Sequence, residues 1–191
     1  MAVRRWIAGT FALVLLVGLS AGAVHAAEPG WKYVEGGYLG VDVDDLEGSG
    51  DNWFVGGAFG GKFWHAIGQY SRGDLSDDLN RKEFRIGAGW HGLLGEKADL
   101  LAEAYYVDTE FGSISDDGYR LVFGVRWRLI KFLELDGFVN YSDLSKFGSD
   151  TSYELRAIVN IWRVGIGAGY EKFDNSDQYN IFARFNFDRG N

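Results

Sequence analysis

The sequence has no cysteine and only three histidines. Without cysteine it has no disulfide, thiol nucleophile, cysteine-ligated metal or lipidated N-terminal cysteine. It also has no excess of positive charge, because 27 acidic residues outnumber 19 basic ones and give a net charge of -8. This balance argues against a nucleic-acid partner, since phosphate backbones are bound by basic surfaces.

The N-terminal segment has the pattern of a secretory signal. Arg4 and Arg5 precede an apolar run over residues 6–19, and small residues at Val24 and Ala26 fit a cleavage site before Ala27. The run is shorter than the roughly 20 apolar residues of a membrane-spanning helix. We therefore expect a cleaved signal peptide over 1–26 and one domain over 27–191.

The rest of the chain lacks helical apolar spacing and alternates apolar and polar residues with a period of two, as β-strands do. Each run has about 9–11 residues, the length that a tilted strand needs to cross a membrane. The ten predicted strands are 32–41, 52–60, 63–72, 82–91, 98–107, 118–128, 133–142, 152–161, 164–173 and 178–187. The predicted fold is all-β, a transmembrane antiparallel up-and-down barrel. Eight strands remain the alternative if one hairpin is misassigned.

The connections between the predicted strands alternate in length. Long connections, such as 42–51, 73–81, 108–117 and 143–151, fall on one rim, and tight turns fall on the other. Both chain ends lie at the tight-turn rim, as expected for a barrel inserted into an outer membrane from the periplasm.

The two faces of these strands differ, one being apolar and the other rich in glutamate and arginine. Alternation alone does not say which face is inside, because a soluble lipocalin-like barrel would turn the apolar face inward. The aromatic residues of the apolar face are sorted by height, as in the two interfacial girdles of membrane barrels. The predicted girdles are Tyr38, Tyr70, Tyr106, Tyr119, Tyr141, Tyr153, Tyr170 and Tyr179 at the long-loop ends and Trp64, Trp90 and Trp127 at the tight-turn ends.

The chain resembles the small outer-membrane β-barrels of Gram-negative bacteria, in the broad OmpA/OmpX-like and porin-like sense. The resemblance rests on the opening segment 33–38, Tyr-Val-Glu-Gly-Gly-Tyr, and on the alternating aromatic residues of the closing strand 178–187. It implies a location in the bacterial outer membrane and contact with lipid, lipopolysaccharide and the assembly machinery. We expect a monomer without a cofactor.

The opposite face is then enclosed and predicts a network of ion pairs across the lumen. A barrel of ten strands is only slightly wider than the eight-stranded size that side chains can fill. The predicted network comprises Arg85, Glu103, Arg120, Arg126, Asp136, Glu154, Arg156 and Arg184. Inward glycines leave two alternatives open, a narrow channel or space for large side chains.

The long-loop rim suggests two further sites. Arg72, Lys82 and Lys172 point outward there and are candidates for contact with lipid phosphates. The acidic cluster Asp42, Asp44, Asp45 and Glu47 could hold a divalent cation, although solvated loop tips explain it as well.

No catalytic residues are predicted. His65 and His91 lie near the tight-turn rim, so the outer rim has no histidine to act as a general base. We expect a non-enzymatic barrel with a narrow or plugged polar lumen, giving at most low-conductance passage of water, ions or very small solutes. The alternative is a protein of surface interaction or envelope integrity that acts through its acidic loops.

Overall fold

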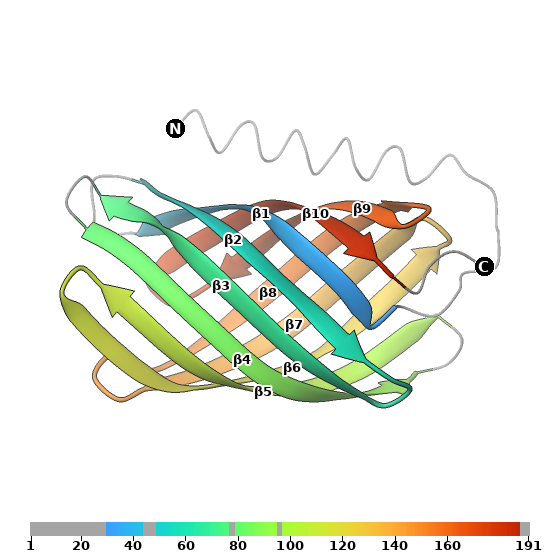
Figure 1. The fold of residues 1–191 in the computed structure, drawn as a ribbon, viewed down its shortest axis with the longest axis horizontal. Helices are drawn as coiled ribbons and strands as arrows, with labels where there is room; N and C mark the ends of the chain where they lie inside the picture. Colours follow the sequence, from blue (N-terminus) through green and yellow to red (C-terminus); the bar gives the residue numbers. More distant parts are fainter. Residues whose placement is uncertain (1–29, 44–48, 77–78, 95–96, 188–191) are drawn as a thin grey trace.

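The computed structural model describes residues 30–43, 49–76, 79–94 and 97–187, which form ten strands (Figure 1). The strands are β1 Lys32–Val43, β2 Ser49–Gly60, β3 Trp64–Ser76, β4 Leu79–Leu93, β5 Ala98–Phe111, β6 Ile114–Ile130, β7 Leu133–Leu144, β8 Gly148–Ile161, β9 Val164–Lys172 and β10 Ser176–Asn186. The predicted signal peptide over 1–26 lies outside these residues. No described segment forms a helix long and apolar enough to span a membrane.

The strands form one closed antiparallel barrel. Each strand pairs with its neighbours in the sequence, and β1 pairs with β10, from Tyr33 opposite Asn186 to Val43 opposite Ser176. Closure leaves no unpaired strand edge, which a sheet in a hydrocarbon layer requires. The strands run obliquely to the long axis, and β1 begins and β10 ends at the same end of the barrel (Figure 1). We call this end, with turns 61–63, 131–132 and 162–163, the terminal rim, and the opposite end the distal rim.

The prediction of long connections at the distal rim is wrong. Strands continue through most of those segments, so that β5 and β6 meet at residues 112–113 and β7 and β8 at 145–147. The predicted strand at 63–72 begins one residue later and ends at Ser76. Beyond the membrane both faces of a strand meet water, so apolar alternation disappears while the ladder hydrogen bonds persist. The alternation therefore marks only the lipid-crossing part of each strand.

The outer surface of the barrel is apolar and the interior is charged. Large apolar side chains stand outward, with Leu155 63%, Ile166 59% and Phe123 56% exposed. Charged groups are enclosed, with Glu134 0% and Arg184 2% exposed. This inverts the distribution of a soluble protein, and it gives the orientation of a barrel that spans a membrane.

Candidate functional site

A network of buried guanidinium and carboxylate groups lies in the terminal half of the lumen. Alternation turns its members inward, because they lie at the strand positions between the lipid-facing residues. This ion network consists of Glu35, Arg126, Arg128, Glu134, Asp136, Arg156 and Arg184.

Two glutamates hold the ion network together. Glu134 Oε1 accepts hydrogen bonds from Arg126 Nη2 at 2.8 Å and Arg184 Nη1 at 3.0 Å. Glu35 Oε2 lies 2.7 Å from Arg184 Nη2 and 3.1 Å from Arg156 Nη2. Because Arg184 contacts both glutamates, the side chains of β1, β7, β8 and β10 are tied together across the lumen. These ion pairs lie in the interior of the barrel, with Glu134 0% and Arg184 2% exposed.

Trp31, immediately before β1, is buried among lumen side chains near the terminal rim. Its ring is 5% exposed and stacks on His65 and His91, with 4.2 Å between ring centroids in each case. Its Nε1 donates a hydrogen bond to Asp99 Oδ2 at 3.1 Å, and the guanidinium carbon of Arg126 lies 4.5 Å from its ring centroid. We refer to this indole and its four neighbours as the Trp31 plug.

The two histidines belong to a continuous chain of hydrogen bonds. His65 Nε2 lies 2.8 Å from Glu103 Oε1, and His65 Nδ1 lies 3.1 Å from His91 Nδ1. The Tyr105 hydroxyl donates to Glu103 Oε2 at 2.6 Å. One Nδ1 must donate and the other accept, so the two rings cannot both be doubly protonated in this arrangement.

Gly89 allows His65 to reach Glu103. It lies between them on β4, opposite His65 of β3 and Glu103 of β5. A Cβ at this position would lie 2.5 Å from the His65 ring and 2.7 Å from Glu103 Cγ. The inward glycine therefore provides space for a neighbouring side chain. A Cβ at Gly167 would likewise meet the Phe182 ring at 2.4 Å, and one at Gly124 the Phe138 ring at 2.3 Å.

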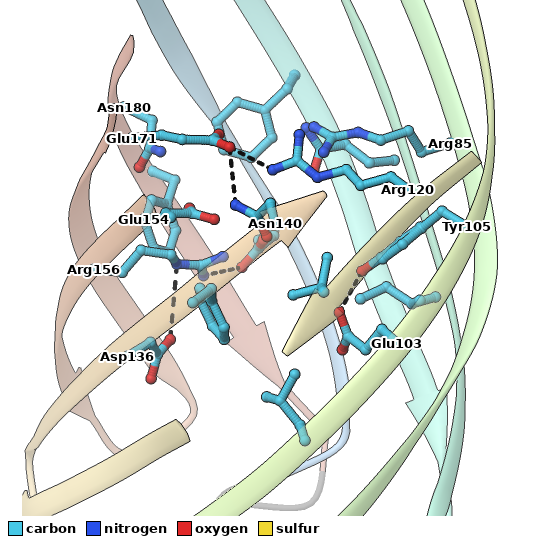
Figure 2. A pocket seen from close by; sticks show the side chains of 18 of the residues that line it. Arg85, Glu103, Tyr105, Arg120, Asp136, Asn140, Glu154, Arg156, Glu171 and Asn180 are labelled. Atoms are coloured by element: carbon cyan, nitrogen blue, oxygen red, sulfur yellow. Dashed lines mark hydrogen bonds and ion pairs between the residues drawn. The ribbon is translucent and has the colours of Figure 1, made fainter. Parts of the chain in front are cut away.

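A second polar cluster lies nearer the distal rim, around Glu171. Its Oε1 accepts hydrogen bonds from Arg120 and, at 2.9 Å, from Asn140 Nδ2 (Figure 2). It also accepts a hydrogen bond from the Ser152 hydroxyl. Glu154 is opposite Glu171 on the neighbouring strand and makes no ion pair with any described residue. The cluster connects β6 and β9 across the lumen.

Side chains of the described residues leave cavities in the lumen. One cavity, of about 100 Å³, extends from Trp31 near the terminal rim to Glu171 nearer the distal rim. Figure 2 shows its charged walls. Another, of about 290 Å³, is closer to the distal rim and has mixed walls, in which Phe111, Phe147 and Phe173 stand beside charged residues such as Arg81 and Glu83. Arg85 and Arg120 border both cavities.

The predicted lumen residues all line the interior of the barrel, but they do not form one network, and Glu154 makes no ion pair with any described residue. Arg126, Asp136, Arg156 and Arg184 belong to the ion network. Arg120 contacts Glu171, and Arg85 Nε pairs with Glu83 Oε1 at 2.9 Å. Glu103 bonds His65 rather than an arginine.

The predicted girdle residues lie on the lipid-facing side at two heights. Tyr106 opposes Tyr119 and Tyr170 opposes Tyr179 towards the distal rim, whereas Trp64 opposes Trp90 towards the terminal rim. Among the predicted metal ligands, Asp44, Asp45 and Glu47 lie outside the described residues. Asp42 lies on β1, opposite Asp177.

Sequence reasoning missed the apolar fill of the lumen. Phe54 and Phe182 are 7% and 3% exposed and pack together with Ile158. Phe182 shares the inward alternation of Arg184, so a strict count of positions could have placed it inside. Alternation could not have placed Trp31 inside the barrel, because Trp31 precedes the first strand.

Comparison with known proteins gives a fold. No protein-family model and no curated protein matches the chain. An outer-membrane channel from Pseudomonas putida F1 superimposes with a TM-score of 0.52 at 9% identity, over 87% of this chain and 99% of that one. The KdgM porin, in a complex with disordered oligogalacturonate, gives a TM-score of 0.50 at 8% identity, over 81% and 99% of the two chains.

The chain has the outer-membrane β-barrel fold. Identities this low establish the architecture alone.

Proposed function

We propose that this chain is a non-enzymatic outer-membrane β-barrel whose lumen passes at most water, ions or very small solutes. The observations that support the proposal are the buried ion pairs across the terminal half of the lumen and the buried Trp31 ring beside them. The ion network crosses the lumen from β1 and β10 to β7, and the Trp31 plug covers the terminal end.

The outer surface supports the membrane location. Lipid-facing aliphatic residues occupy the middle of the strands, with tyrosines and Trp53 towards the distal rim and Trp64, Trp90 and Trp127 towards the terminal rim. The fold shared with a porin and an outer-membrane channel supports a barrel of the channel type.

The space left in the lumen favours very small solutes. The cavity beside the ion network has about 100 Å³, which suits a few ordered waters bound to charged groups. A larger solute would have to separate buried ion pairs, and an unpaired buried charge is costly. Passage of a sugar therefore requires the buried ion pairs to rearrange, whereas passage of water does not.

The histidines support a structural rather than catalytic role for the lumen. Both side chains are buried, and their ring nitrogens are engaged with each other and, through His65, with Glu103. A general base needs access to a substrate proton.

Proteoliposomes containing the folded full chain test the proposal. In stopped-flow light scattering, vesicles exposed to a gradient of raffinose or glucose should shrink. Their volume should not recover, just as the volume of empty vesicles does not. Rapid recovery in raffinose would contradict a closed lumen. Gel migration that changes on heating confirms in the same samples that the barrel is folded.

A further inference from the structure

We propose that the outward surface of β2 to β5 near the distal rim binds the phosphate group of a membrane lipid through Arg72 and Lys82. Four lipid-facing residues there are successive partners across the strands: Trp53, Arg72, Lys82 and Glu110. The inference concerns the outside of the barrel and does not depend on whether the lumen conducts.

The central pair in this row carries two like charges. Arg72 and Lys82 are directly opposite each other on β3 and β4, and like charges in this position destabilise a sheet. Lys82 Nζ has Glu110 on its other side, 3.1 Å from both carboxylate oxygens. Arg72 has Trp53 on its other side and makes no ion pair with any described residue. An anion bound between the two cations would offset this repulsion.

The height of the pair suits a lipid headgroup. Arg72 and Lys82 lie one outward position above Tyr70 and Phe84, which oppose each other on the same strands. The Trp53 and Tyr70 rings pack with 5.5 Å between centroids. Amphipathic aromatic residues mark the interface between hydrocarbon and headgroups. Cations directly above them meet the phosphates, which arginine and lysine bind through charge-assisted hydrogen bonds.

The next residues outward favour a lipid over free phosphate. Asp51 and Asp74 oppose each other one outward position further from the membrane, and both are exposed. An anion that approaches from water must pass these carboxylates, which repel it. A lipid phosphate reaches Arg72 and Lys82 sideways within the leaflet and avoids them.

Lys172 gives a matched control at the same rim. It is opposite Asp177, with Lys172 Nζ 3.6 Å from Asp177 Oδ1. Because its cross-strand partner has the opposite charge, no unbalanced pair of cations exists there. The sequence predicts Lys172 as a lipid-phosphate contact together with Arg72 and Lys82. Because of its ion pair with Asp177, Lys172 is not part of the proposed site.

Native mass spectrometry of the folded full chain in a neutral detergent tests the site. The ligands are phosphatidic acid, diacylglycerol with the same acyl chains, and inorganic phosphate. The chain should bind phosphatidic acid in preference to the other two. The double variant Arg72→Gln, Lys82→Gln should bind it at least about tenfold more weakly, as expected for losing two charge-assisted contacts. Lys172→Gln should stay within about twofold of the parent chain.

Three results would overturn the proposal. They are unchanged binding in the double variant, an equal loss in Lys172→Gln, and binding of diacylglycerol or inorganic phosphate as tight as that of phosphatidic acid. Heat-dependent gel migration must be the same in all variants, so that a loss of binding reports the site and not the fold.

Discussion

Arg184 and Glu134 face each other across the lumen, with 3.0 Å between Nη1 and Oε1, although they lie on β10 and β7, which are not neighbours in the sheet. Both side chains are almost completely buried. The contact therefore links β10 to β7 through the interior of the barrel and braces it from inside.

Replacing Glu134 should reveal how much this brace stabilises the barrel. Glu134→Ala leaves Arg126 and Arg184 without the carboxylate that both contact. Removing one partner of a buried ion pair costs about 3–5 kcal/mol of unfolding free energy. The loss of unfolding free energy is measured by urea unfolding in detergent, with gel migration as the readout of the folded fraction.

Glu110→Ala is the matched control for that variant. Glu110 pairs with Lys82, and both side chains are about two-fifths exposed, at 42% and 39%. Exposed pairs contribute at most about 1 kcal/mol. Equal losses in the two variants would contradict a bracing role for Glu134.

A methyl group at position 89 should disturb the chain of hydrogen bonds through the histidines. In Gly89→Ala the new Cβ would lie 2.5 Å from the His65 ring, so the ring must move away from Glu103. Overpacking of this kind costs about 1–3 kcal/mol. NMR of the histidine side chains should show changed His65 resonances together with lower stability.

Gly68→Ala on β3 is the control for the change at position 89. Its Cβ would meet the Arg85 carbonyl oxygen at 3.5 Å, an ordinary contact. Unaltered His65 resonances in Gly89→Ala, or an equal disturbance in Gly68→Ala, would show that Gly89 does not provide the space for this contact.

The positions of the charged residues could be predicted from sequence, but their partners could not. Alternation with a period of two places Arg184 and Glu134 on the enclosed face whatever the details of the barrel. Pairing across a lumen depends on the stagger of the strands around the barrel, which alternation does not encode. Thus Glu103 was expected in a network with arginines, whereas it bonds His65 and Tyr105.

The ends of the strands were harder to predict for a different reason. Asp116 and Asp117 lie within β6, although their composition suggests a loop. A segment above the membrane needs no apolar face, so only the ladder of backbone hydrogen bonds identifies it as a strand.

Asp116 should titrate at an unusually low pH. Desolvation raises its pKa, but the backbone N–H groups of Lys146, Phe147 and Asp117 donate to its carboxylate and lower the pKa below the ordinary value. A lowered pKa means that this carboxylate stabilises the turn between β7 and β8 above the pKa of an unfolded aspartate. The contribution is lost as pH falls through the folded-state pKa.

Carbon-13 NMR of the Asp116 carboxyl group measures that titration. The midpoint should lie below about 3.9, the value of an unperturbed aspartate. A midpoint for Asp116 at or above the ordinary value would contradict the contact with the turn.

Removing the indole of Trp31 should open the terminal end of the lumen. Trp31→Ala eliminates stacking on His65 and His91 and leaves Asp99 without its indole donor. We expect faster ion leakage from proteoliposomes than with the parent chain. Trp64→Ala is the control because that ring is 65% exposed on the lipid side; equal leakage from both variants would contradict a plug.

Single-channel recording of the unmodified folded chain in planar lipid bilayers tests the closed lumen most directly. The ion network and the Trp31 plug predict rare, small current steps or none at any moderate voltage. Large, stable openings on the nanosiemens scale would contradict the account, because they require an open aqueous path where Arg184, Glu134 and Trp31 now lie.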